Sequence, residues 1–77
     1  MTIFAVITVA RQIEGEYIFI RTEKGFQRAG KADDLLKKLK QDYVDEAGKP
    51  KVISLSTPSG DANCFCEVGV FEVEIEE

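Results

Sequence analysis

The segment TIFAVITVA, residues 2–10, is the feature that most constrains this chain, because nearly every side chain in it is apolar. It is rich in β-branched residues and shorter than most helices, which is typical of a strand. Successive side chains of a strand point to opposite faces, and here Ile3 and Ile7 share one apolar face while Phe4 and Val6 share the other. A strand of this kind needs cover on both faces.

The chain offers one helix to provide that cover. KADDLLKKLKQDYVDEA, residues 31–47, has apolar residues at helical spacing, with lysines and aspartates on the remaining face. Asp33 and Asp34 fall in the predicted first turn, where the helix macrodipole favours anions. Gly48 followed by Pro50 predicts a left-handed cap and a stop. We expect an amphipathic helix of about four turns.

Three further segments are predicted to be strands. EYIFIRT, residues 16–22, follows a tight reversal at Gly15 and forms a hairpin with residues 2–10. KVISLST, residues 51–57, and CFCEVGVFEVEIEE, residues 64–77, form a second hairpin around the turn-rich sequence TPSGDAN.

The last predicted strand contains a change of phase. Cys64, Cys66, Val68 and Val70 lie at even positions, whereas Phe71, Val73 and Ile75 lie at odd positions. A one-residue bulge near Gly69 would bring both sets onto one face, and glycine is common in bulges. With that bulge, four carboxylates face away from the core and partly form a straight negative row: Glu67, Glu72, Glu74 and Glu76.

The predicted order is ββαββ in a single domain, residues 1–77, because a chain of 77 residues closes only one hydrophobic core. One amphipathic helix packed on a four-stranded, mostly antiparallel sheet is a two-layer α+β domain. The order of strands across the sheet is either 2-1-4-3 or 2-1-3-4, and the pattern leaves both open.

One helix leaves one face of such a sheet uncovered. We expect apolar side chains from three of the strands on that face: Phe4, Val6, Tyr17, Phe19 and Phe65. An uncovered apolar face is normally a partner surface. We therefore predict a homodimer or a hetero-interface through this face, with strand addition at an open sheet edge as a second route.

The charge distribution bears on the class of partner. The formal net charge is −4, and residues 52–77 hold six acids and no base. Such a chain is a poor candidate for direct nucleic-acid binding, which depends on neutralising phosphates. The carboxylate row is either a solvated face that keeps a long strand from pairing with neighbours or a phosphate-like track that fits a basic groove on another protein.

Few residues in the chain are suited to catalysis or metal binding. There is no histidine, which excludes nucleophilic catalysis with a histidine base. Cys64 and Cys66 are the only thiols and fall short of the four ligands of a structural zinc site. They lie about 7 Å apart in a strand, which is poor for a disulfide, so we expect reduced, buried thiols. We predict no enzyme activity, no cofactor and no metal.

The stretch GFQRAGKADD resembles a phosphate-binding loop, with Gly25, Gly30 and Lys31 at nearly the required spacing. Position 32 is Ala, which cannot ligate magnesium, and the chain is too short for the parallel sheet of such enzymes. A simple anion site formed by Arg28, Gly30 and Lys31 at the helix start remains an alternative.

The apolar run in residues 2–10 is far shorter than the roughly 20 residues that cross a bilayer. No positive charge precedes it, so we expect no signal peptide and a cytoplasmic protein without membrane contact.

These features together predict a small acidic protein-interaction module, without catalysis and dimeric. A sharper hypothesis is an inhibitor or regulator, of the kind that phages and mobile elements encode, that docks on a basic groove of a nucleic-acid-processing protein. The alternative is an anion- or ligand-sensing or structural subunit of a larger complex that uses the loop Gly25–Lys31.

Overall fold

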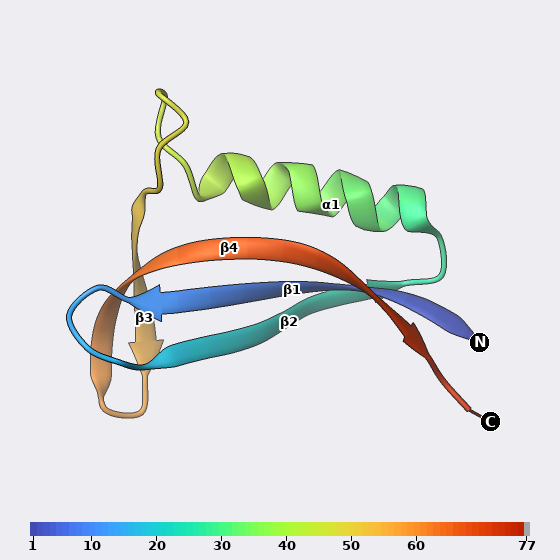
Figure 1. The fold of residues 1–77 in the computed structure, drawn as a ribbon, viewed down its shortest axis with the longest axis horizontal. Coiled ribbons are helices and arrows are strands. Elements are labelled where there is room, and N and C mark those ends of the chain that lie inside the picture. Colours follow the sequence, from blue (N-terminus) through green and yellow to red (C-terminus); the bar gives the residue numbers. More distant parts are fainter. Residues whose placement is uncertain (77) are drawn as a thin grey trace.

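The computed structural model describes residues 1–76. It has the predicted ββαββ order and the predicted α+β class, with one helix packed on a four-stranded antiparallel sheet (Figure 1). The elements are β1 (Thr2–Gln12), β2 (Ile18–Phe26), α1 (Ala29–Asp42), β3 (Val52–Thr57) and β4 (Gly60–Glu74).

The strands lie in the order β2-β1-β4-β3, which is the first of the two predicted orders. β1 and β4 are the central pair and keep one continuous antiparallel register, from Thr2 opposite Glu74 to Gln12 opposite Cys64. A central strand has no solvated edge, which agrees with the nearly continuous apolar sequence of β1. β3 has 6 residues and β4 has 15, so β3 borders only the first part of β4.

The bulge predicted near Gly69 is wrong, because the β1–β4 register is unbroken there. The irregularity lies instead in β2, where Val6 is opposite Lys24 but Ile7 is opposite Thr22, so that Glu23 is the extra residue. The change of phase in β4 has another cause. Apart from Phe65, its apolar side chains lie on the helix side as far as Val70 and on the opposite side from Phe71 onward.

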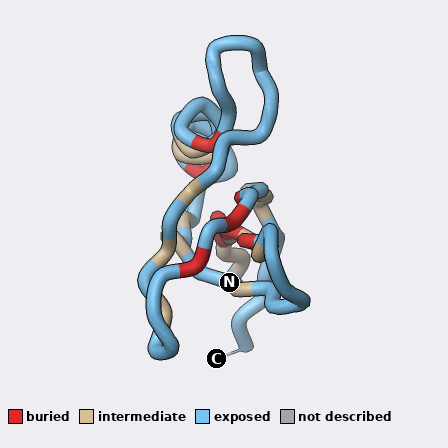
Figure 2. The backbone as a smooth tube through the Cα atoms, turned by 90° about the vertical axis from the view of Figure 1, so that its left-hand side faces the viewer, coloured by how far each residue is buried: buried red, intermediate tan, exposed pale blue. Residues whose placement is uncertain are grey.

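The core lies between α1 and the face of the sheet formed by the even-numbered residues of β1. Val6 and Cys64 are fully buried, and Ala10, Cys66 and Tyr43 are nearly so. Small side chains on the strands allow the helix to approach the sheet closely. Figure 2 shows buried positions on α1 and on the strands that it faces, whereas the loop after the helix is exposed.

The helix is shorter than predicted at its C-terminal end, because it stops at Asp42 and not near residue 47. The carboxylate of Asp45 accepts hydrogen bonds from the N–H groups of Ala47 and Lys49, each at 2.9 Å. Such local side-chain bonds compete with helix continuation. Gly48, with φ of 79°, therefore closes this small turn and does not cap the helix.

The helix also begins earlier than predicted, at Ala29. Asp33 and Asp34 consequently lie beyond the first turn, which holds no acidic residue. Asp33 instead pairs with Lys37 one turn later, at 3.0 Å. Gly25 lies within β2 and not in the loop before the helix.

We expect Val6→Ala to lower the free energy of unfolding by about 2 kcal/mol, because it removes two methyl groups from a fully buried site and leaves a cavity. Val52→Ala is the matched control, since the Val52 side chain is about half exposed, and its cost should stay below about 0.5 kcal/mol. Urea unfolding followed by circular dichroism measures both, at a protein concentration low enough for the chain to be monomeric. Equal losses for the two variants would contradict the assignment of Val6 to the core.

Candidate interaction surfaces

Large apolar side chains gather on the sheet face opposite α1. We call this face the open face, and the register defines its exposed large members as Ile18, Ile20, Val52, Phe65, Phe71 and Val73. Together they surround Ala5, Ile7 and Val9 of β1, which they bury in part. No segment within residues 1–76 packs over the open face, because α1 lies on the other side of the sheet (Figure 1).

The residues predicted for this surface are mostly elsewhere. Val6 is fully buried under the helix, and Phe19 packs against the core cluster that contains Ala10 and Tyr43. Phe4 shares the even-numbered, helix-side parity of β1 and lies opposite Phe26. These three assignments to the uncovered face are therefore wrong.

Tyr17 and Phe65 have different outcomes. Tyr17 precedes β2 and stacks on Phe19, with ring centroids 6.4 Å apart, so it belongs to the helix side. Phe65 lies opposite Arg11 and Val52 and is on the open face. An uncovered apolar face therefore exists, but Phe65 is the one member of the predicted set that the structure places there.

Sequence alone assigned the two faces of β1 the wrong way round. Both faces are apolar, so hydropathy does not distinguish them, and one residue of register decides which side every residue of β2 takes. The core-facing side of β4 was predicted correctly at Cys64 and Cys66, and with Ala62 they form a run of small side chains that fits beneath a closely packed helix. Their parity places the odd-numbered residues of β4 on the open face, and the register between β1 and β4 then fixes the face of each β1 residue.

The open face carries one base, Arg11, and two acids, Glu67 and Asp61, of which Asp61 lies opposite Ser56 beside the β3–β4 turn. Arg11 lies opposite Phe65, and Glu67 lies opposite Val9, one position further along the same face. The side chains of Arg11 and Glu67 are exposed, and neither forms an ion pair with another described residue. The face therefore holds one positive and two negative side chains, whereas the whole chain has a net charge of −4.

The predicted row of four outward carboxylates is not formed. Glu67 points to the open face, whereas Glu72 and Glu74 share the helix-side parity of Cys64 and Cys66. Glu74 accepts a hydrogen bond from the hydroxyl of Thr2 and lies 3.9 Å from the N-terminal ammonium group. Glu76 lies beyond the end of β4. The phosphate-like track thus loses the geometry on which it depended.

The predicted anion-binding residues lie together near the start of α1. Arg28 is the N-terminal flanking residue of the helix, and it and Lys31 line an open depression of about 450 Å³. Gly30 lies in the first turn, with free space where a side chain would be. The arrangement is an exposed helix start with two nearby cations, and none of the described residues that line the depression is buried.

Tyr43 is the centre of a polar contact inside the core that the sequence did not indicate. Its hydroxyl lies 3.0 Å from the hydroxyl of Thr8, whose residue is only 3% exposed. Arg21 donates to the same tyrosine oxygen at 3.5 Å and to the carboxylate of Glu23 at 2.7 Å. The hydrogen bond to Glu23 raises the pKa of Arg21 above its ordinary value. The network fixes the C-terminal end of α1 over β1 and β2.

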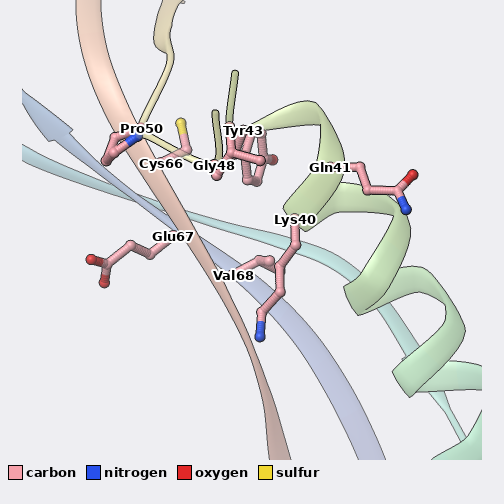
Figure 3. A pocket seen from close by; sticks show the side chains of 9 residues that line it. Lys40, Gln41, Tyr43, Gly48, Pro50, Cys66, Glu67 and Val68 are labelled. Atoms are coloured by element: carbon pink, nitrogen blue, oxygen red, sulfur yellow. The ribbon is translucent and has the colours of Figure 1, made fainter. Parts of the chain in front are cut away.

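A cavity of about 500 Å³ lies between the C-terminal end of α1, the loop after it and the middle of β4. Tyr43, Val44, Pro50, Cys66 and Val68 form much of its wall, with Lys40 and Glu67 at its border. In Figure 3 the Lys40 side chain extends from the helix toward Val68, and the Glu67 side chain points away from the helix.

Both cysteines are free and buried. Burial raises the pKa of the Cys66 thiol above its ordinary value of 9.0, and the neighbouring Cys64 adds to that rise. In residues 1–76 no three or more side chains of the metal-ligating types His, Cys, Asp and Glu form a candidate metal site. No helix of the same residues has the length and apolar character to cross a membrane.

Comparison with known protein families, with curated proteins and with solved structures finds no match to this chain.

We expect Tyr43→Phe to lower the free energy of unfolding by about 1–2 kcal/mol, because the Thr8 hydroxyl is then buried without a partner. Thr8→Val alone should also destabilise, since it leaves the tyrosine hydroxyl with only the longer bond to Arg21. The double variant should cost less than the sum of the two, because it removes both partners. Strictly additive losses in denaturant titrations would mean that the two hydroxyls do not interact.

The raised pKa of Cys66 predicts a loss of stability in alkaline solution. The folded state holds the thiol proton at a pH where the unfolded state releases it, so the stability contribution is complete below pH 9.0 and is lost as pH rises from there through the higher pKa of the folded protein. Thermal unfolding between pH 7 and 10.5 measures this fall. Cys66→Ala is the control and should show a smaller alkaline fall than the unmodified chain.

Proposed function

We propose that this chain is a non-catalytic protein-interaction module that self-associates through its open face. The observation that carries the proposal is the gathering of large, exposed apolar side chains on the one sheet face that α1 does not cover. Each square ångström of such surface removed from water contributes about 25 cal/mol. Exposed apolar patches of this kind mark interaction sites in soluble proteins.

The size of the open face is compatible with a dimer of two copies. Four strands at about 4.8 Å spacing and about nine residues at about 3.3 Å give roughly 600 Å² in projection, and the accessible area of a corrugated surface is larger. Stable interfaces bury about 600–1,000 Å² on each partner. Two sheets can pack face to face at about 10 Å, with their side chains interdigitated.

The charges on the open face support a second copy as the partner. In a two-fold interface each surface meets itself, so a uniformly charged face repels its partner. Here Arg11 and Glu67 lie on the same face with opposite sign, and Arg11 of one copy can meet Glu67 of the other. Asp61 adds one negative charge at the turn end of this face, but most of the surplus negative charge of the chain lies away from it, which lowers the repulsion between two copies.

Ile20→Lys tests the proposal, because the Ile20 side chain is 71% exposed and contributes little to the fold of a single copy. We expect the dissociation constant of the dimer, measured by sedimentation equilibrium, to rise at least about tenfold. Tyr17→Lys is the matched control, since Tyr17 is 72% exposed but lies outside the open face. Self-association through this face would be refuted if the unmodified chain stays monomeric over a 100-fold range of protein concentration. It would also be refuted if the two variants change the dissociation constant equally.

A charge exchange distinguishes self-association from binding of another protein. Arg11→Glu and Glu67→Arg should each weaken the dimer, by about threefold to tenfold at low salt, because each places like charges opposite one another. The double variant should recover most of the loss. If the double variant is weaker than both single variants, the two side chains do not face each other across the interface.

A further inference from the structure

The longest strand has a free edge. β3 pairs with β4 only from Gly60 to Phe65, and within residues 1–76 no strand lies beside β4 on that side from Cys66 to Glu74. Figure 1 shows the cause: β3 lies at one end of the sheet, where the loop from α1 enters it, while β4 continues toward the other end. A vacant position for one more strand results.

The backbone groups at this edge point outward at every second residue. Met1 and Ile75 exchange both backbone hydrogen bonds, at 3.1 and 2.8 Å, and Ile13 donates to Asn63 at 3.0 Å. The odd-numbered residues of β4 therefore bond to β1, and the even-numbered ones point away from it. Five residues present outward N–H and C=O groups that β3 does not reach: Cys66, Val68, Val70, Glu72 and Glu74.

The side chains beside the vacant position differ between its two ends. At the end near β3, the apolar cavity lined by Tyr43, Val44 and Val68 lies on the helix side (Figure 3). At the other end, the side chains of Glu72 and Glu74 lie on the same face of the sheet, the helix side. Lys40 borders the cavity and disfavours a second cation there.

We propose that the edge of β4 from Cys66 to Glu74 binds an extended segment of another protein by strand addition, with basic residues opposite the two glutamates and apolar residues opposite Val68 and Val70. An antiparallel direction is favoured, since antiparallel pairs form straighter hydrogen bonds and are more frequent. Read from its N-terminus, the segment carries Lys or Arg at positions 1 and 3 and a branched apolar residue at positions 5 and 7. Its backbone supplies affinity, and its alternate side chains supply specificity.

This surface is separate from the open face, so the two proposals fail independently. Strand addition extends the sheet sideways and uses backbone groups in its plane, whereas the open face uses side chains perpendicular to it. The dimerisation variant Ile20→Lys should therefore bind the segment as the unmodified chain does. Loss of binding in that variant would contradict the proposal that the edge of β4 binds the segment separately from the open face.

The test uses a synthetic peptide of seven residues, capped at both ends, with the sequence lysine-threonine-lysine-threonine-isoleucine-threonine-isoleucine. The peptide is titrated into the full chain labelled with ¹⁵N. We expect saturable shifts of the amide signals of Val68, Val70 and Glu72. Glu72→Gln should weaken binding about threefold at low salt, and the difference should shrink as salt is added. A peptide with glutamate in place of lysine is the matched control and should bind much more weakly.

Backbone pairing has its own control in the peptide. Methylation of the amide nitrogen at position 5, which faces Val70, should reduce affinity at least about tenfold, because it removes a hydrogen bond to β4 and adds a clash. Methylation at position 6 should have little effect, since that amide points away from β4. The proposal is overturned if both methylations act equally, if the shifts fall on β2, if the acidic peptide binds as well, or if no binding occurs.

Discussion

The structure depends on one unequal arrangement: a single helix covers one face of a four-stranded sheet whose central strands are apolar on both faces. The covered face is built from small side chains, Ala10, Ala62, Cys64 and Cys66, which let α1 approach closely. Several larger aliphatic and aromatic groups of β2 and β4, among them Ile18, Ile20 and Phe71, are left on the other face. Both proposed interaction surfaces follow from this, because one helix and one short edge strand cannot cover a sheet of this length.

The polar contact around Tyr43 has a defined place in that arrangement. A helix held on a sheet only by apolar side chains can slide, because the hydrophobic effect has no direction. The hydroxyl pair of Thr8 and Tyr43, with Arg21 beside it, fixes the end of α1 relative to β1 and β2. Tyr43 also lines the cavity beside β4, so its hydrogen bonds fix the position of the cavity wall as well. A few hydrogen bonds thus determine the shape of a surface.

The architecture could be predicted from the sequence, because the segment order and the helical periodicity require no knowledge of long-range pairing. Which face of the sheet each strand residue occupies could not be predicted so easily. The side that Phe19 or Ile20 takes depends on the register of the first hairpin, and the extra residue at Glu23 is visible only in the pairing with β1. The early end of α1 depends on Asp45, whose side chain bonds to the following turn. The free edge of β4 follows from two strand lengths, and strand boundaries are weakly encoded in sequence.

The length of β4 has a consequence for communication across the molecule. Its odd-numbered residues, including Phe71 and Val73, belong to the open face, and its even-numbered residues present the free backbone groups of the edge. One strand therefore takes part in two surfaces. If occupancy of either surface changes the twist or the stiffness of β4, each ligand alters the affinity of the other by the same factor, as thermodynamic linkage requires.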